Sequence, residues 1–339
     1  MAKLFESITV GGLEIRNRVV MPPMCMYSAD LGGHASDFHV MHYGARAVGG
    51  AGLIIVEATG MENSGRISNH CLGAYEDSHI DGLSRIAAAV KAAGAAAAIQ
   101  LGHAGRKCTA DVPEIFAPSA VAFDDKHKTP KEMTVADIDR IVQAFGDAAA
   151  RAGKAGFDMI EIHGAHGYLI STFLSPLTNM RRDEYGGSYE NRARLLGRVL
   201  DAVHANFNGA VCVRVSASDF AEGGNRPEDV AAMLNCVKDR GIDIVDVSAG
   251  GVVPARPTVY PGYMVKFAET VKQLTGLSVM AGGLLTQPTH MEDIAANDRA
   301  DMVYVGRELL RNPNFVHLAS AQMGVKAGWP KQYKVLNQE

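Results

Sequence analysis

Two imidazoles and a phenol occur within six residues of the chain, at His163, His166 and Tyr168. Two neutral imidazole N–H groups can hold a carbonyl oxygen and stabilise the negative charge that grows on it, while a phenol can supply a proton. The same histidines, preceded by Glu161, also suit a zinc ion with water in the open coordination position. A third zinc ligand is missing nearby and Tyr168 suits proton donation better, so we prefer metal-free catalysis. A purely structural histidine pair stays open.

Arg214 ends an apolar segment, Val211-Cys212-Val213, and is expected to face the interior of the fold. An unpaired buried charge is very costly, so this arginine needs an anionic or polar partner. One candidate is the carboxylate of Glu161, which shares its parity with His163 on the preceding predicted strand. The other is an electron-rich ring that becomes an anion when it is reduced, and the spacing does not choose between them.

A phosphate site is predicted near the C-terminus. Gly282 and Gly283 end one late apolar segment, and Gly306 and Arg307 end the next. Glycine lets a phosphate approach the backbone, and the following helix offers unpaired N–H groups. The arginine adds a positively charged guanidinium group that can donate two parallel hydrogen bonds to the phosphate. The alternative is that these glycines only make tight strand-to-helix turns.

The segment from Met21 to Tyr27 closes the first predicted strand with the thiol of Cys25 and a phenol. Methionines in such a place are more often packing residues than cofactor contacts, and Cys25 could equally be buried and inert. The five cysteines of the chain include no Cys-x-x-Cys pair, which argues against disulfides, zinc knuckles and iron–sulfur clusters. Any special cysteine is therefore expected to act alone.

Eight short apolar segments must position these residues. Each is β-branched or alanine-rich, as strands that are covered on both faces should be. Their alternation with helices predicts an α/β fold, a (β/α)8 TIM barrel with its active site at the C-terminal mouth. Most of them end at a polar or glycine residue: Gln100, His163, Arg214, Ser248, Gly282 and Gly306. The predicted strands are Arg18 to Met21, Leu53 to Glu57, Ala96 to Leu101, Met159 to His163, Val211 to Ser216, Ile244 to Ser248, Ser278 to Ala281 and Met302 to Val305.

Helical patterns lie between these strands, with Thr134 and Ser188 as N-caps and Pro227 in a first turn. A Gly-Gly pair within Ile8 to Ile15 predicts an N-terminal β-hairpin that caps the bottom of the barrel. Two segments without a clear period, Arg106 to Thr134 and Leu174 to Gly187, are assigned to the mouth as long loops. We expect a single domain over residues 1–339. The predicted helices include Asp81 to Ala93, Val135 to Ala155, Tyr189 to Asn206, Glu228 to Arg240 and Tyr263 to Thr275.

Composition limits the class of protein. The 339 residues are 47% hydrophobic and 21% charged, which is ordinary for a soluble globular protein, and no run of about 18 apolar residues exists to span a bilayer. The N-terminus lacks the pattern of a secretory signal, so we expect a cytoplasmic protein. A net charge of −4 disfavours a nucleic-acid partner.

Together these segments resemble the Old Yellow Enzyme family of flavin-dependent ene reductases, and among them its YqjM-like, or thermophilic-like, branch. The resemblance covers essentially the whole chain, and so many ordered motifs make chance agreement implausible. It is carried by Pro22-Pro23-Met24-Cys25-Met26-Tyr27, Gln100-Leu101-Gly102-His103-Ala104-Gly105-Arg106-Lys107, Phe116-Ala117-Pro118-Ser119, His163-Gly164-Ala165-His166-Gly167-Tyr168-Leu169, Phe173-Leu174-Ser175-Pro176, Arg182-Asp183-Glu184-Tyr185-Gly186-Gly187-Ser188, Glu190-Asn191-Arg192, Val213-Arg214-Val215-Ser216 and Gly306-Arg307-Glu308-Leu309-Leu310.

The resemblance implies a tightly bound, non-covalent FMN across the barrel mouth, which NAD(P)H reduces and a small activated alkene reoxidises. Enones, enals, maleimides and nitroalkenes are the implied substrates. Hydride from flavin N5 would reach Cβ while Tyr168 delivers a proton to Cα, and His163 and His166 would hold the substrate oxygen with Tyr27 nearby. The implied cofactor contacts are Gln100 at the pyrimidine edge, Arg214 at N1 and O2, Cys25 near N5 and O4, Pro23, Met24 and Ala58 around the ring, and Gly282, Gly283, Gly306 and Arg307 at the phosphate.

Two alternatives come from other functional classes. One is a zinc-dependent barrel hydrolase or lyase that uses the histidine pair, and the other is a flavin-binding protein without turnover.

One departure from the branch concerns the C-terminus. In the branch's pattern an arginine lies just beyond a tyrosine that matches Tyr333, and it reaches into the neighbouring subunit's site. This chain has Val335 at the arginine's place, with Lys334 beside it. The departure argues against an active site shared across a dimer, while a homodimer or homotetramer is still what the resemblance implies.

Overall fold

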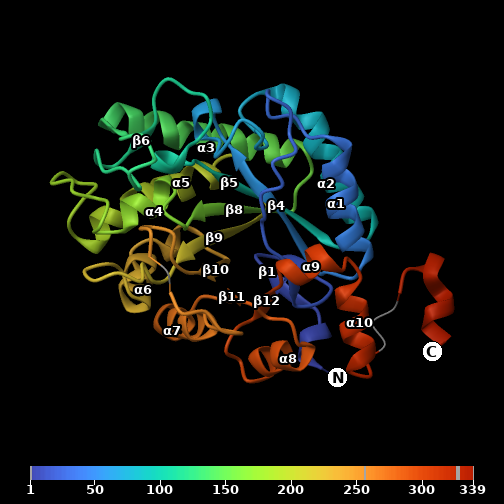
Figure 1. Ribbon diagram of the computed structural model, residues 1–339. Coiled ribbons are helices and arrows are strands. Elements are labelled where there is room, and N and C mark those ends of the chain that lie inside the picture. The colour runs from blue at the N-terminus through green and yellow to red at the C-terminus, as the bar shows by residue number, and fades with distance from the viewer. Residues whose placement is uncertain (1, 256, 326–328, 339) are drawn as a thin grey trace.

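The computed structural model describes residues 2–255, 257–325 and 329–338. Eight parallel strands close into a barrel, in the spatial order β10-β11-β12-β3-β4-β5-β8-β9, and helices surround it (Figure 1). The predicted (β/α)8 architecture is therefore confirmed. The barrel strands are β3 (Val19–Met21), β4 (Leu53–Gly60), β5 (Ala96–Gly102), β8 (Met159–Gly164), β9 (Ala210–Ser216), β10 (Ile244–Ser248), β11 (Val279–Ala281) and β12 (Met302–Tyr304).

The helices begin and end where their sequences provide caps. Thr134 accepts the Asp137 N–H at 3.2 Å, and Ser188 accepts the Asn191 N–H at 3.2 Å, so both predicted N-caps are confirmed. The predicted helix from Glu228 to Arg240 is shorter than expected, because α6 ends at Asn235 and a separate 3-10 turn follows. The helices are α1 (Asp37–Val48), α2 (Ile80–Ala92), α3 (Val135–Lys154), α4 (Leu169–Leu174), α5 (Tyr189–His204), α6 (Pro227–Asn235), α7 (Val265–Thr275), α8 (Pro288–Ala296), α9 (Arg307–Arg311) and α10 (Phe315–Gln322).

The hydrophobic core has two layers, one between the strands and the helices and one inside the barrel. The predicted hairpin forms from β1 (Ile8–Val10) and β2 (Leu13–Ile15), which pair antiparallel. Its Val10 and Ile15 belong to the inner layer, together with Ala210 and Ile244 near the starts of β9 and β10. Burying each such aliphatic side chain stabilises the fold by about 1.5–3 kcal/mol. The hairpin thus closes the bottom of the barrel and leaves the C-terminal mouth as the open end.

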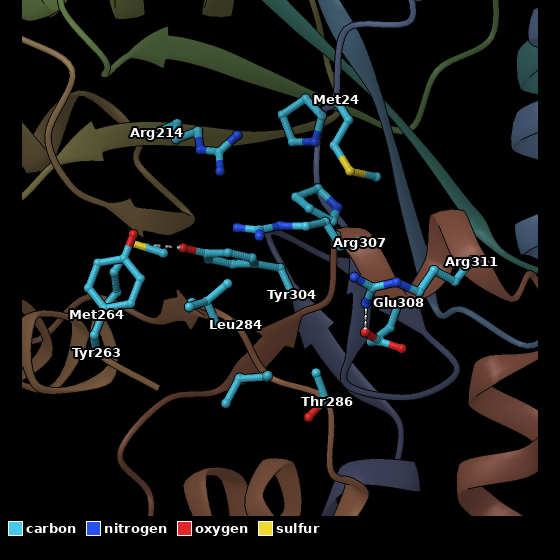
Figure 2. A pocket seen from close by; sticks show the side chains of 15 residues that line it. Met24, Arg214, Tyr263, Met264, Leu284, Thr286, Tyr304, Arg307, Glu308 and Arg311 are labelled. Atoms are coloured by element: carbon cyan, nitrogen blue, oxygen red, sulfur yellow. Dashed lines mark hydrogen bonds and ion pairs between the residues drawn. The ribbon is translucent and has the colours of Figure 1, made fainter. Parts of the chain in front are cut away.

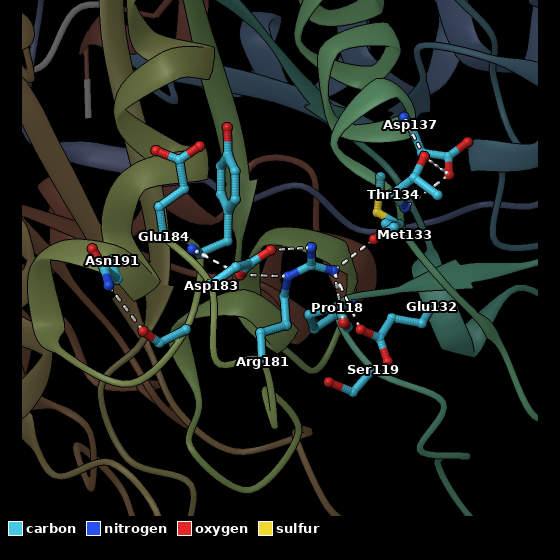
Figure 3. A network of polar contacts seen from close by, with 12 residues as sticks. Pro118, Ser119, Glu132, Met133, Thr134, Asp137, Arg181, Asp183, Glu184 and Asn191 are labelled. Carbon is cyan, nitrogen blue, oxygen red and sulfur yellow. Dashed lines mark hydrogen bonds and ion pairs between the residues drawn. The ribbon is translucent and has the colours of Figure 1, made fainter.

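A buried arginine joins the two long loops at the mouth (Figure 3). Arg181, in the loop after α4, donates from Nη1 to the carbonyl oxygens of Met133 at 2.6 Å and Pro118 at 3.2 Å. Its other side forms an ion pair with Asp183. The loop before α3 also contains a short parallel pair, β6 (Phe116–Ala117) and β7 (Lys131–Glu132). Both loops therefore have fixed paths beside the mouth.

The C-terminal segment Lys331–Gln338 lies to one side of the barrel in Figure 1. Tyr333 is 45% exposed and Val335 is 66% exposed. The side chain of Lys334 is outside the described part of the structure, and no partner chain is present, so the expectation about a shared site stays a prediction. Among the described residues, no helix has the length and apolar character needed to cross a membrane.

Candidate active site

A layer of buried polar side chains crosses the barrel just below its mouth, with Arg214 at its centre. Arg214 Nε lies 3.1 Å from Asp246 Oδ2, and both side chains are buried. Of the two partners left open by the sequence, Glu161 is not the directly paired carboxylate, because Asp246 takes that place. In the barrel register, β9 places Arg214 beside His163 of β8 and beside Asp246 of β10, whereas Glu161 lies beside Cys212.

Glu161 forms its own cluster next to this ion pair. The Gln100 amide donates to Glu161 Oε1 at 2.7 Å, and the Cys212 thiol donates to Oε2 at 3.4 Å. Burial and the neighbouring Asp246 raise the pKa of Glu161 to about 8. Although burial lowers it, the two carboxyls raise the pKa of Arg214 above its ordinary value, so this guanidinium stays charged.

An open cavity of about 310 Å³ lies above the polar layer (Figure 2). Three arginines line it, Arg214 from β9 and Arg307 and Arg311 from α9, and of these Arg214 and Arg307 have no ion pair with Glu308. Glu308 and Arg311 pair with each other at its rim. A cavity with two cations and an apolar wall suits a planar ligand that carries an anionic group. The other predicted residues that line it are Pro23, Met24, Gly283 and Gly306.

The glycines at this cavity have different roles. Gly283 has a φ of +104°, a conformation that favours glycine, and it lines the cavity. A Cβ on Gly306 would lie only 3.3 Å from Met24 Sδ, so a side chain there would crowd the cavity wall. A Cβ on Gly282 would meet the Tyr304 ring at 2.1 Å. Gly282 is therefore placed to make room for Tyr304, and it does not line the cavity itself.

His163, His166 and Tyr168 come together at the end of β8. The ring centroids of His163 and His166 are 5.3 Å apart, and those of His163 and Tyr168 are 5.0 Å apart. Burial and the positive charge of Arg214 lower the pKa of both histidines well below the usual value, so both imidazoles are neutral. Burial also raises the pKa of Tyr168, which keeps its phenol protonated.

A backbone hydrogen bond indicates the tautomer of His163, whereas the tautomer of His166 depends on the direction of its bond to Ser248. The Ala165 N–H donates to His163 Nδ1 at 3.4 Å, so the ring proton of neutral His163 is on Nε2. His166 Nε2 lies 2.7 Å from Ser248 Oγ, a contact that the sequence did not suggest. When the Ser248 hydroxyl donates in this contact, the proton of His166 is on Nδ1.

Lys107 holds the backbone of this loop, a role that the sequence did not indicate. His166 has a φ of +62°, a left-handed conformation that is rare outside glycine. Lys107 Nζ donates to the carbonyl oxygens of His166 at 3.0 Å and Gly251 at 3.3 Å. Burial and the nearby Arg106 lower the pKa of Lys107 to about 8. The amine therefore holds the backbone that presents the second imidazole.

The segment after β3 carries Cys25 and Tyr27 at the same mouth. Buried Glu57 accepts the Met26 N–H at 2.8 Å and the Tyr43 hydroxyl at 3.1 Å, which fixes this segment. Burial raises the pKa of Glu57 to about 7. Tyr27 is 50% exposed, and partial burial with the neighbouring Cys25 raises its pKa to about 12.

A small crevice is lined by Ala58, His163 and Tyr168, among other residues. Ala58 is near the C-terminal end of β4, so it lies at the same end of the barrel as the histidine loop. Within the described residues no group of three or more histidine, cysteine, aspartate and glutamate side chains is arranged to hold a metal ion, so the zinc alternative lacks a ligand set there.

Comparison with known proteins gives consistent matches along the chain. A family model described as "NADH:flavin oxidoreductase / NADH oxidase family" matches residues 3–325. A protein named NADPH dehydrogenase from Geobacillus thermodenitrificans (strain NG80-2) is 54% identical over 333 residues, which cover 98% of this chain and 97% of that relative.

Solved structures show the same similarity. An old yellow enzyme homologue from Zymomonas mobilis has a TM-score of 0.82 and 27% identity, with 94% of this chain and 93% of that chain covered. A 2-naphthoyl-CoA reductase in complex with 2-naphthoyl-CoA has a TM-score of 0.89 and 25% identity over 95% of this chain. The match covers 52% of the naphthoyl-CoA reductase, so this chain spans about half its length.

Proposed function

The chain belongs to the NADH:flavin oxidoreductase / NADH oxidase family, and from this premise we propose that it reduces the carbon–carbon double bond of small activated alkenes. It is an FMN-dependent NADPH dehydrogenase, because its family is that of FMN oxidoreductases and relatives of about half identity are named NADPH dehydrogenase. The proposed electron acceptors are enones, enals, maleimides and nitroalkenes. We also propose that residues 1–339 form one FMN-binding domain.

The residues at the mouth fit FMN. Apart from its ion pair with Asp246, Arg214 Nε lacks a hydrogen-bond partner among the described residues. A cationic side chain held at the cavity wall suits the electron-rich pyrimidine end of a flavin, and Arg307 with Gly283 and Gly306 suits its phosphate. Gln100 is proposed at the pyrimidine edge, with Cys25, Pro23, Met24 and Ala58 around the ring and Gly282 behind Tyr304.

Bound FMN supplies the chemistry of accepting hydride from NAD(P)H and giving it to the β-carbon of the alkene. In this proposal the Nε2–H of His163 and the Nδ1–H of His166 donate to the carbonyl or nitro oxygen of the substrate. Neutral imidazoles suit this role because they donate without forming an ion pair that would hold an anionic product. The proposal assigns the Ser248 hydroxyl as donor to His166 Nε2, 2.7 Å away, which leaves the ring proton on Nδ1.

Tyr168 is the proposed proton donor to the α-carbon. Its raised pKa keeps the proton on the phenol until carbanion character develops on the substrate, which is the condition for a general acid. Tyr27, on the opposite segment of the mouth, is proposed to contact the substrate and narrow its pocket.

The closeness of His163, His166 and Tyr168 beside a cavity with two guanidinium groups is the observation that carries this proposal. The test is to reduce the purified holoenzyme with NADPH without oxygen and then add 2-cyclohexen-1-one or N-methylmaleimide. We expect alkene-dependent reoxidation of the flavin and the saturated product by mass spectrometry. Reduction by NADPH with no reoxidation by any alkene would instead support flavin binding without turnover on alkenes.

We propose in addition that the chain forms a homodimer or homotetramer. Phe38, Met41 and Leu310 are exposed large apolar side chains that line one shallow surface depression near the mouth. Such a patch is typical of interaction surfaces. Light scattering on a sizing column measures the assembly, and a monomer at micromolar concentration would contradict the proposal.

A further inference from the structure

Asp246 is a buried carboxylate that lies directly behind Arg214 and does not line the cavity itself. It is on β10, where the barrel register places it beside Arg214 of β9. Its exposed fraction is 0%, and its Oδ2 lies 3.1 Å from Arg214 Nε. A charge buried this deeply is costly without a counter-charge, so the two side chains form a buried ion pair.

This ion pair uses only one edge of the Arg214 guanidinium. Nε faces Asp246, and the guanidinium carbon lies 5.6 Å from the centroid of the Tyr304 ring, within the range of a cation–π contact. Tyr304 is itself held, because its hydroxyl donates to the Val247 oxygen at 2.9 Å. Arg214 lines the cavity, and Figure 2 shows its guanidinium end turned toward it. Asp246 thus fixes one edge of the guanidinium and leaves the opposite end for a ligand.

A second carboxyl of the same layer is neutral. Glu161 is fully buried, and it accepts from Gln100 at 2.7 Å and from Cys212 at 3.4 Å. Burial and the negative charge of Asp246 raise the pKa of Glu161 to about 8. Burial raises the pKa of Asp246 as well, although the guanidinium beside it opposes this shift. At neutral pH the layer therefore holds one positive charge, on Arg214, and one negative charge, on Asp246.

Reduction of the flavin changes the charge next to this layer. A hydride from NADPH brings two electrons and one proton, so bound FMN gains one negative charge until it takes a second proton. In the proposed binding mode this charge lies beside Arg214. A cation there favours the reduced flavin, and a carboxylate behind the cation opposes it, because both charges act on the same ligand in an interior of low dielectric constant.

We propose that Asp246 is a positioning residue that sets the reducing power of the flavin, because it cancels part of the positive charge that Arg214 presents to the ring. The proposal rests on the proposed placement of the flavin pyrimidine at Arg214, and it does not depend on which alkene is reduced. Its consequence is a lower midpoint potential, which makes the reduced flavin a stronger hydride donor.

The midpoint potential of bound FMN tests this role. The holoenzyme is reduced slowly without oxygen by xanthine and xanthine oxidase in the presence of a reference dye, so neither NADPH nor an alkene takes part. Glu161→Gln is compared with the double variant that adds Asp246→Asn. In this background position 161 cannot ionise in place of Asp246, and asparagine keeps an oxygen that can accept from Arg214 Nε.

The expected shift has a definite sign. At pH 7 Glu161→Gln should keep the ratio of reduced to oxidised flavin within about threefold of wild type at the same dye ratio, because Glu161 is already neutral. Adding Asp246→Asn should raise this ratio at least about tenfold, which is about 30 mV for a two-electron couple. Asp239→Asn in the same background is the matched control. It removes an exposed carboxylate in the 3-10 turn after α6, so the ratio should stay within about threefold.

An unchanged or lower ratio in the double variant overturns the proposal. A lower ratio is what a purely structural role of Asp246 predicts, because Arg214 would then have moved away from the flavin. Circular dichroism and flavin content report whether the variant is folded. If the double variant does not fold, Asp246→Asn alone is measured at pH 6. There Glu161 keeps its proton, because burial is the main cause of its raised pKa, and the same rise is expected.

Arg214→Gln separates this proposal from the placement of the flavin. The variant removes the cation and leaves the charge of Asp246, so the ratio should fall at least about tenfold. A fall in Arg214→Gln without a rise in the double variant contradicts the role of Asp246 alone. No change in either variant contradicts the proposed placement of the flavin as well, whereas alkene reduction is tested by its own half-reaction.

Discussion

Burial sets the protonation of the three side chains at the end of β8, and the positive charge of Arg214 adds to its effect on the two histidines. The same environment that keeps His163 and His166 neutral keeps Tyr168 protonated, because the charged form of each group would lose its hydration. The site therefore holds three neutral hydrogen-bond donors at neutral pH. Such a set can stabilise developing negative charge on a substrate oxygen and then supply a proton.

Replacing Tyr168 with phenylalanine removes the proposed proton and little else. We expect flavin reduction by NADPH to keep its rate within about threefold, whereas reoxidation by an enone slows about 10²–10⁴-fold, the usual contribution of a general acid. Stopped-flow absorbance of the flavin measures both half-reactions. Equal slowing of the two would refute the assignment of Tyr168 as proton donor.

The histidine pair is tested by ligand binding without turnover. A phenolate such as that of p-hydroxybenzaldehyde should bind oxidised holoenzyme and give a charge-transfer band. Replacing both His163 and His166 with alanine should weaken binding at least about 100-fold, since each hydrogen bond to a charged oxygen contributes roughly 1.5–3 kcal/mol.

His204→Ala is the control for this experiment, because His204 contacts the Gly241 oxygen on the outside of the barrel. A double variant that still shows an unchanged band would contradict the role of the two imidazoles.

At the scale of elements, the sequence predicted the strands within one to three residues because each is a short apolar run. Because all strands of the barrel end at one mouth, the strand assignments also predicted that the histidine loop, Arg214 and the late glycines lie there. The alternation of strands and helices was predicted, but no bounds were given for helices α1, α4, α8, α9 and α10. Ser248 was predicted at a strand end without a role, and no role was predicted for Asp246 or Lys107.

The register explains the missed partner of Arg214. Parity along a strand says which face a side chain takes, and it placed Glu161 and Arg214 on the same face. It does not say how far one parallel strand is shifted against the next. The observed shift places Asp246, and not Glu161, directly beside Arg214.

The clamp formed by Arg181 gives a prediction for the loops. Arg181→Ala leaves the buried carbonyls of Met133 and Pro118 without their donor, which costs roughly 1–3 kcal/mol for each group. We expect faster proteolysis and faster amide exchange within residues 106–134, while the barrel strands keep their protection. Arg182→Ala, at the exposed neighbouring arginine, is the matched control. Unchanged exchange in Arg181→Ala would show that the two loops are held independently.

At the scale of the whole molecule, the buried polar layer makes stability depend on pH. Glu161 has a folded-state pKa of about 8, above the value near 4.3 of an unfolded chain. Between these values the folded protein keeps a proton that the unfolded chain has released, so stability falls as pH rises, by up to about 1.4 kcal/mol per pH unit.

Urea unfolding at pH 6 and pH 8, with FMN in fixed excess, measures this loss of stability. Glu161→Gln should show a smaller loss than wild type, because glutamine does not titrate. Glu222→Gln, at an exposed position, should behave as wild type. A variant at position 161 with the full wild-type dependence would assign the proton to another buried group, such as Glu57.

Because the N-terminal hairpin closes the bottom of the barrel, the C-terminal mouth is the open end through which substrates reach the site. Under the proposed function, NADPH and the alkene both enter and leave through this mouth. We therefore expect the two substrates to compete for it, so that an excess of either one inhibits turnover. The eight-residue hairpin at the bottom of the barrel in this way constrains how substrates reach the site at the opposite end.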